Sequence, residues 1–256
     1  MGDLFSKAIL AWKNKQYDVE LNGEAALVRR LGRFKSAILF DVGANVGDWS
    51  LPALKGLPET HVHVFEISPS TAQELQRNLE PYAGRATVNK IGLGSSEGEI
   101  KLYFSPDSTT AASSVPGVVE FSAIYHQIRT INEITARITT GDKYMRENRI
   151  DGIDFLKIDV EGAEWDVLKG FADAFADRKI QMVQFEYGPL NLKTRQMLGD
   201  FWKFFTDSDS TVGKLYPEGV AFKDFDLSDE DITATNFIAC LNSRTDLIDA
   251  LRCEVL

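Results

Sequence analysis

The chain has 256 residues, of which 44% are hydrophobic and 26% charged, so it can bury a core without disulfides and is too apolar for a disordered protein. Its 38 acidic and 28 basic residues give a formal charge of −10, which argues against a general attraction for nucleic acid or an anionic membrane. Its two cysteines fit no disulfide or zinc pattern. No apolar run approaches the ~20 residues of a membrane span, and we therefore expect a cytoplasmic protein.

The first 36 residues predict a helical extension in front of a larger domain. Apolar residues between Phe5 and Trp12 share one face of a first helix. A second helix runs through Ala25–Leu31, with Asn22 as its cap and Gly32 near its end. Neither helix carries an obvious catalytic group, so we place the functional domain at residues 37–256.

From residue 37 onward, short apolar runs alternate with helical stretches. Five runs have strand length and are rich in β-branched or aromatic residues: Ala37–Val42, His61–Ile67, Thr87–Ile91, Phe155–Val160 and Ile180–Tyr187. Such alternation specifies a parallel sheet with right-handed crossovers. The sequence therefore predicts an α/β, Rossmann-like fold with helices on both faces of a mostly parallel sheet.

Other segments depart from this alternation. Glu99–Phe104 follows a turn, so we expect it to form a hairpin with the third strand. Ser105–Gly117, rich in Ser, Thr and Ala, predicts a mobile loop near the working end. Antiparallel strands are expected to close the sheet edge at Lys214–Tyr216, Val220–Phe222 and Thr235–Cys240.

The segment Phe40–Asp48 joins the first strand to a helix through a glycine-bearing turn. Gly43 and Gly47 let the backbone approach a ligand closely, in the crevice where open α/β sheets bind ligands. Asn45 stands where a pyrophosphate-binding G-x-G-x-x-G loop has its second glycine, so that pattern fails. Asp41 would repel a pyrophosphate but suits a sulfonium and an ammonium group. This charge favours S-adenosylmethionine (SAM) over a nicotinamide dinucleotide.

Polar residues at the next two strand ends fit a nucleoside. Glu66 lies 23 residues after Gly43, where its carboxylate can accept both ribose hydroxyl protons. Asn89 and Gly92 follow at the end of the third strand, where an amide and a small backbone step suit adenine. The alternative for Asn89 is a turn asparagine that contacts no ligand.

These residues resemble the FkbM family of SAM-dependent methyltransferases over residues 37 to 240. The specific part is the block Lys157–Glu164, because the first glycine loop alone would indicate only a generic methyltransferase. The other matching pieces are Phe40–Gly47, Phe65-Glu66, Asn89, Gly92–Gly94, Gly98, Thr140–Asp142, Leu168–Gly170 and Glu186. The chain departs from the family pattern at Gly141, where leucine is more typical, and at Ile67, where proline often follows the acid.

The resemblance implies the seven-stranded class I methyltransferase fold and methyl transfer to oxygen. The expected acceptor is a hydroxyl on a sugar or on a natural product, either a small molecule or a glycosylated one. Two alternatives remain open: an RNA ribose 2′-O-methyltransferase, which could use Lys157, and a nucleoside-binding module without turnover. The acidic balance weighs against the first, and the acids at the strand ends weigh against the second.

Acidic residues lie where the fourth and fifth strands should end. A neutral hydroxyl is a poor nucleophile, so a general base or a metal should assist it. Asp159 and Glu161 are two residues apart and would share a face of a continuing strand, and Glu186 could complete an oxygen-rich site for Mg²⁺. Alternatively, one of these acids is the base and no metal is needed.

Further side chains near these acids have two interpretations each. Lys157 lies in an apolar strand and needs an acidic partner, so it either orients the acceptor or forms a structural ion pair. Glu161 and Glu164 could simply favour the start of the following helix, where acids contribute roughly 0.3–1 kcal/mol each. Ser113 and Ser114 are candidates for acceptor contact, and His126 is a further candidate base.

Overall fold

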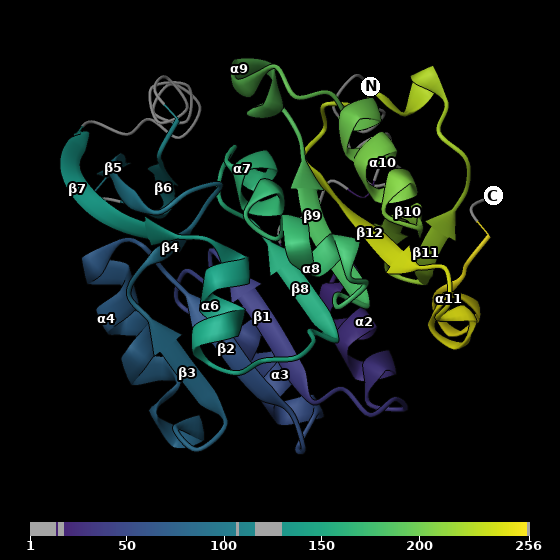
Figure 1. Cartoon of the computed structure of the whole chain (residues 1–256), viewed down its shortest axis with the longest axis horizontal. Coiled ribbons are helices and arrows are strands. Elements are labelled where there is room, and N and C mark those ends of the chain that lie inside the picture. The colour runs from purple at the N-terminus through teal and green to yellow at the C-terminus, as the bar shows by residue number, and fades with distance from the viewer. Residues whose placement is uncertain (1–13, 15–17, 106–107, 116–129, 255–256) are drawn as a thin grey trace, which may run out of the picture.

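The computed structural model describes residues 14, 18–105, 108–115 and 130–254, and an eight-stranded sheet forms its centre (Figure 1). The sheet has the order β11-β10-β12-β9-β8-β1-β2-β3. The strands are β1 (Ile38–Val42), β2 (His61–Phe65), β3 (Ala86–Asn89), β8 (Phe155–Ile158), β9 (Met182–Tyr187), β10 (Ser210–Tyr216), β11 (Gly219–Phe222) and β12 (Thr235–Leu241). The five strands β3, β2, β1, β8 and β9 are parallel neighbours, whereas β12 and β10 pair antiparallel.

The α/β prediction and the five parallel strands are confirmed. The antiparallel closure of the sheet near the C-terminus is also confirmed. The strand number differs from the expected seven, because β11 forms a hairpin with β10 and adds an eighth strand at the edge.

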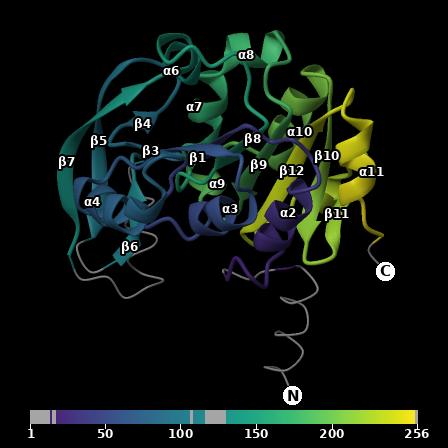
Figure 2. The same cartoon turned by 90° about the horizontal axis from the view of Figure 1, so that it is seen from below.

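Helices cover both faces of this sheet, as Figure 2 shows. One face packs against α6 (Gly141–Glu147), α7 (Glu164–Lys169), α8 (Ala172–Ala176) and α10 (Leu198–Asp207). The other packs against α2 (Glu24–Leu31), α3 (Ser50–Gly56), α4 (Pro69–Asn78) and α11 (Thr245–Leu251). Three short helices, η1 (Glu80–Tyr82), α9 (Asn191–Thr194) and η2 (Leu227–Asp229), lie in connections. Leu39 and Phe40 point to opposite faces and are both fully buried, which explains the continuous apolar run of β1.

Helix α2 is packed into the domain and starts at Glu24, one residue earlier than expected. Leu27, Val28 and Leu31 are buried in the same cluster as Leu39 of β1. The N-cap is Gly23 and not Asn22, although the Asn22 side chain, one residue earlier, accepts the Glu24 backbone N–H at 2.9 Å. The first predicted helix, at Phe5–Trp12, lies outside the described residues, as does His126.

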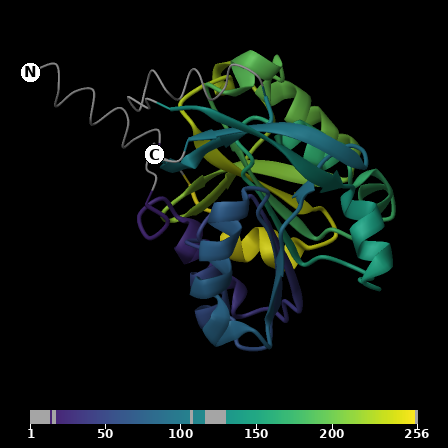
Figure 3. The same ribbon diagram turned by 90° about the vertical axis from the view of Figure 1, so that its left-hand side faces the viewer.

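A second, four-stranded sheet overturns two predictions. It has the order β4-β7-β5-β6 and comprises β4 (Gly92–Leu93), β5 (Gly98–Ser105), β6 (Ser108–Ser113) and β7 (Asn132–Thr139). Strand β5 pairs with β6 and β7 and not with β3, so the expected hairpin with the third strand is wrong. Part of the predicted Ser105–Gly117 loop is strand β6. Figures 1 and 3 show this sheet beside the α4 end of the main sheet, above β2 and β3 in Figure 1.

Gly141, one of the departures from the family pattern, has a packing reason. A Cβ atom there would lie 2.2 Å from Cε1 of Phe171, a fully buried ring in the core. A leucine at this position would therefore require Phe171 to move. None of the helices in the described part of the chain has the length and apolarity that a membrane span requires.

Candidate active site

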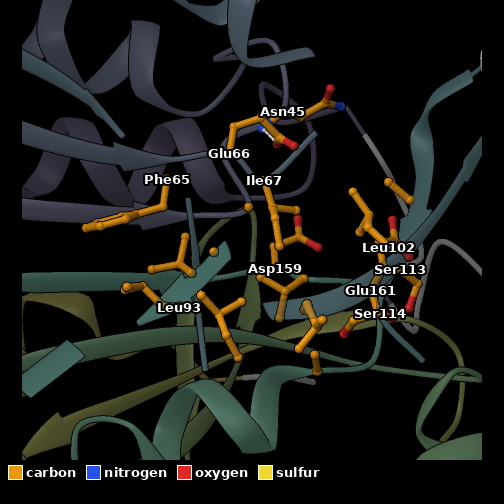
Figure 4. A pocket seen from close by; sticks show the side chains of 18 residues that line it. Asn45, Phe65, Glu66, Ile67, Leu93, Leu102, Ser113, Ser114, Asp159 and Glu161 are labelled. Carbon is orange, nitrogen blue, oxygen red and sulfur yellow. Dashed lines mark hydrogen bonds between the residues drawn. The ribbon is translucent and has the colours of Figure 1, made fainter. Parts of the chain in front are cut away.

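A pocket opens between the carboxyl ends of β1, β2 and β8 and the second sheet. It encloses about 830 Å³, its open mouth included. The second sheet contributes an apolar wall of Ile100, Leu102 and Ile138. Figure 4 shows Leu102, Ser113 and Ser114 beside Glu161 on one side of the pocket, with Phe65 and Leu93 on the other. The wall was not predicted, because its strands pair over long sequence distances.

The glycine loop after β1 lies directly against the end of β8. Gly43 has a φ of 82°, and a Cβ atom there would lie 1.8 Å from the carbonyl oxygen of Asp159. Its backbone N–H donates to the carbonyl of Phe65 at 3.0 Å, which joins the loop to β2. Gly47, with a φ of 100°, packs against Leu75 of α4. Glycine is therefore needed here for close packing against the protein itself, whereas the sequence predicted a close approach to a ligand.

Asn45 and Glu66 connect the glycine loop to the end of β2. Glu66 accepts the Asn45 backbone N–H at 3.0 Å and the Ser68 backbone N–H at 2.8 Å. Burial raises the pKa of Glu66 to about 7, against the lowering effect of these two hydrogen bonds. Each carboxylate oxygen has a further lone pair, so Glu66 can still accept ribose hydroxyls. The Oδ1 atom of Asn45 is buried without a protein donor.

A buried ion pair lies behind the pocket. Lys157 Nζ is 3.3 Å from both Asp41 and Asp159, and Asp41 also accepts the Ser50 hydroxyl at 2.6 Å. Burial lowers the pKa of Lys157, but the carboxylates of Asp41, Asp159 and Glu24 together raise it further than burial lowers it. Lys157 is therefore charged. Asp41 is fully buried and is not among the pocket-lining residues, so the expected direct contact between Asp41 and the cofactor is not seen.

The loop after β8 presents two acids to the pocket. Asp159 and Glu161 both line it. Strand β8 ends at Ile158, and Glu161 has a left-handed φ of 54°, so the expectation that both acids share a face of a continuing strand is wrong. Burial, and then the charges of Glu186, Asp159 and Glu164, raise the pKa of Glu161 well above its usual value.

Glu164 holds this loop from within. Its Oε1 atom accepts the backbone N–H groups of Val160 and Gly162 at 3.1 and 3.0 Å. The side chain is buried, and burial raises its pKa to about 7. Its role is thus structural, because it holds the loop between β8 and α7.

The three acids proposed as magnesium ligands do not come together at the pocket. Glu186 lies on β9 opposite Asn236 and does not line the pocket. Across the described residues, no group of three or more His, Cys, Asp and Glu side chains is arranged to hold a metal ion. The predicted set of Asp159, Glu161 and Glu186 therefore does not fit Mg²⁺, and we derive no step through a metal.

Of the two residues predicted to contact adenine, one lines the pocket and the other does not. Gly92 lines the pocket, and a Cβ atom there would lie 2.7 Å from Cδ1 of Ile67, which also lines it. Asn89 is not a lining residue, and its amide donates to the carbonyl of Val64 at 3.1 Å. Asn89 therefore matches the alternative of a structural asparagine.

A buried polar group that includes Glu24, Gln184 and Asn236 was missed by the sequence analysis. Glu24 accepts the side-chain amides of Gln184 and Asn236 at 2.6 and 2.7 Å. Gln184 lies next to Lys157 across β8 and β9. A glutamine within the apolar run of β9 was the available signal, of the same kind that singled out Lys157.

Comparison with known proteins now decides the family. The model of the methyltransferase FkbM domain matches residues 41–210. The chain belongs to the FkbM methyltransferase family. It is a SAM-dependent methyltransferase.

Known FkbM relatives are distant in sequence. The hexuronic acid methyltransferase AglP of Haloferax volcanii is 26% identical over 203 residues, covering 76% of this chain and 78% of AglP. The 31-O-demethyl-FK506 methyltransferase FkbM of Streptomyces tacrolimicus is 28% identical over 168 residues, covering 57% of this chain and 64% of that protein. The solved structure of methyltransferase FkbM from Methylobacillus flagellatus KT superposes with a TM-score of 0.50 at 20% identity, over 80% of this chain and 43% of the other. That structure supports the fold alone.

Proposed function

We propose that this FkbM methyltransferase transfers a methyl group from SAM to a hydroxyl of a sugar or a glycosylated natural product. The observation that carries the proposal is a single hollow bordered by the glycine loop, Glu66, Asp159 and Glu161. The name of AglP, a hexuronic acid methyltransferase, supports a sugar acceptor. The name of the Streptomyces relative, which acts on a demethylated oxygen, supports transfer to oxygen. Carboxylates in the site would repel phosphates, which disfavours an RNA acceptor.

The cofactor end of the pocket is proposed at the glycine loop. Glu66, which lines the pocket, would accept the ribose hydroxyls. Gly43 and Gly92 keep this end of the pocket free of side chains. SAM supplies a methyl group on a sulfonium, which the acceptor oxygen displaces in line, so that alignment carries much of the catalysis.

The acceptor end is proposed at Glu161 and Asp159. Glu161 is our candidate general base, because a carboxylate with a raised pKa accepts a hydroxyl proton more effectively near neutral pH. Asp159, held by Lys157, would accept a hydrogen bond from the same hydroxyl and orient it. Glu186 raises the pKa of Glu161 without lining the pocket.

The test is transfer of labelled methyl groups to a panel of hexuronic acid glycosides, neutral glycosides and the free aglycones. We expect transfer to a glycoside hydroxyl, a loss of roughly 10²–10⁴-fold in Glu161→Gln, and no effect of EDTA. Glu99→Gln, an exposed acid on β5, is the matched control. Transfer to the aglycones alone would contradict the sugar acceptor, and full activity of Glu161→Gln would contradict the assigned base.

A further inference from the structure

The peptide that carries Glu161 has an uncommon backbone conformation. Glu161 and Gly162 have φ values of 54° and 100°, both in the left-handed region. A non-glycine residue in that region persists only where its surroundings hold it. Glu164 holds the N–H groups on either side of Glu161. The carbonyl of Glu161 itself requires a partner from elsewhere.

That partner is Ser113, at the end of β6 in the second sheet. Its hydroxyl donates to the Glu161 carbonyl at 2.8 Å and accepts the Val115 backbone N–H at 3.0 Å. The two bonds use the hydroxyl in complementary directions, because its single proton goes to Glu161 while a lone pair takes Val115. Ser113 is only 2% exposed, so water does not readily replace it. A buried hydroxyl of the second sheet thus contacts the loop after β8.

We propose that Ser113 is a positioning residue, whose hydroxyl holds the Glu161 peptide so that the carboxylate faces the cofactor pocket. This rests on the proposed function, which places the acceptor hydroxyl at Glu161 and therefore brings the sulfonium, from which that oxygen takes the methyl group, close to the same carboxylate. Ser113, Glu161 and Asp159 all line the same hollow (Figure 4). The acceptor contact expected for Ser113 from the sequence is thereby replaced by a role through Glu161.

If Ser113 holds Glu161 in this position, the pocket should distinguish ligands by the charge on their sulfur atom. SAM has a cationic sulfur, whereas S-adenosylhomocysteine has a neutral one and is otherwise nearly the same ligand. The ionised carboxylate of Glu161 favours SAM by Coulomb attraction, and the sulfonium in turn lowers the raised pKa of Glu161 and so favours that ionised form. When the Ser113 hydroxyl is removed, Glu161 can leave this position, so SAM should lose affinity while S-adenosylhomocysteine does not.

The first measurement needs no ligand. Hydrogen exchange in peptides that contain residues 159–162 should be faster in Ser113→Ala than in the parent protein. Thr135→Ala, which removes an exposed hydroxyl from β7 of the same sheet, should leave this exchange unchanged. Unchanged exchange in Ser113→Ala would overturn the proposal whether or not the protein binds SAM.

The second measurement is calorimetric titration with SAM and S-adenosylhomocysteine. We expect Ser113→Ala to bind SAM roughly three- to tenfold more weakly, the range of one lost hydrogen bond, and S-adenosylhomocysteine within about twofold. Ser113→Thr, which keeps the hydroxyl, should restore the parental ratio of the two affinities. In a Glu161→Gln background the Ser113→Ala change should no longer alter that ratio.

Two results of the titration would overturn the proposal. An equal loss of affinity for both ligands in Ser113→Ala would show that Ser113 only forms part of the pocket wall. An undiminished effect of Ser113→Ala in the Glu161→Gln background would show that Ser113 does not act through Glu161. Failure of the parent protein to bind SAM would instead contradict the proposed placement of the cofactor, while hydrogen exchange would still test the contact.

Discussion

The carboxylate of Glu66 accepts the backbone N–H of Asn45 at 3.0 Å and thereby joins the end of β2 to the glycine loop after β1. The second oxygen accepts the N–H of Ser68 at the start of α4. Glu66 therefore shapes the loop and faces the pocket at the same time. A substitution at Glu66 should affect both the fold and cofactor binding.

Glu66→Ala should weaken SAM binding roughly tenfold or more and lower the free energy of unfolding by about 1–3 kcal/mol, because two backbone N–H groups lose their acceptor. Calorimetric titration with SAM and urea unfolding measure the two effects. Glu66→Gln keeps one acceptor oxygen and should lose less stability than Glu66→Ala. Unchanged SAM affinity in Glu66→Ala would contradict the assigned ribose contact.

Gly43→Ala should disrupt the junction of β1 and β8. The added methyl group would lie 1.8 Å from the Asp159 carbonyl oxygen in a left-handed backbone, so we expect a loss of several kcal/mol or no folded protein. Gly84→Ala is the matched control, because a Cβ atom there meets nothing within 4 Å. Its unfolding free energy should stay within about 0.5 kcal/mol of the parent. Equal stabilities of the two variants would refute the close packing.

Lys157→Met should be strongly destabilising. It leaves Asp41, which is fully buried, without its cation, and breaking such a pair by removing one partner costs about 3–5 kcal/mol. Adding Asp41→Asn should recover much of this loss, because the uncompensated buried charge is then removed. Urea unfolding of the two single variants and the double variant gives the coupling energy. Additive losses would show that the two side chains do not act as a pair.

Glu164 should make the protein less stable as the pH rises. Its folded pKa of about 7 lies above the usual 4.5, so the folded state holds a proton that the unfolded state has released. This contribution to stability is full below pH 4.5 and is lost as the pH rises through about 7. The free energy of unfolding should fall by about 3 kcal/mol through this group.

Glu164→Gln tests this pH dependence, since an amide oxygen can accept both loop N–H groups but does not titrate. In urea unfolding between pH 5 and 8, the free energy of unfolding should decrease less with rising pH in the variant than in the parent protein. Parallel curves would mean that Glu164 is ionised in the folded state throughout this range.

The local sequence was sufficient for the parallel strands, the glycine loop and the family. Buried parallel strands such as β1 are continuous apolar runs, and Gly43 is needed for a turn that only glycine can form without a clash. These features depend on residues close together in the chain. The resemblance over Lys157–Glu164 then identified the family before any geometry was known.

The tertiary structure decided which of the candidate residues face the pocket. Asp41 and Asp159 stand at adjacent strand ends and look equivalent in sequence, yet Lys157 pairs with both and only Asp159 reaches the cavity. Strand β7 pairs with β4 and β5 over long sequence distances, so no local turn motif predicted the second sheet or its apolar wall. The contact of Ser113 with Glu161 depends on that sheet. Local pattern fixes backbone conformation, whereas side-chain environment depends on long-range packing, which a single sequence does not display.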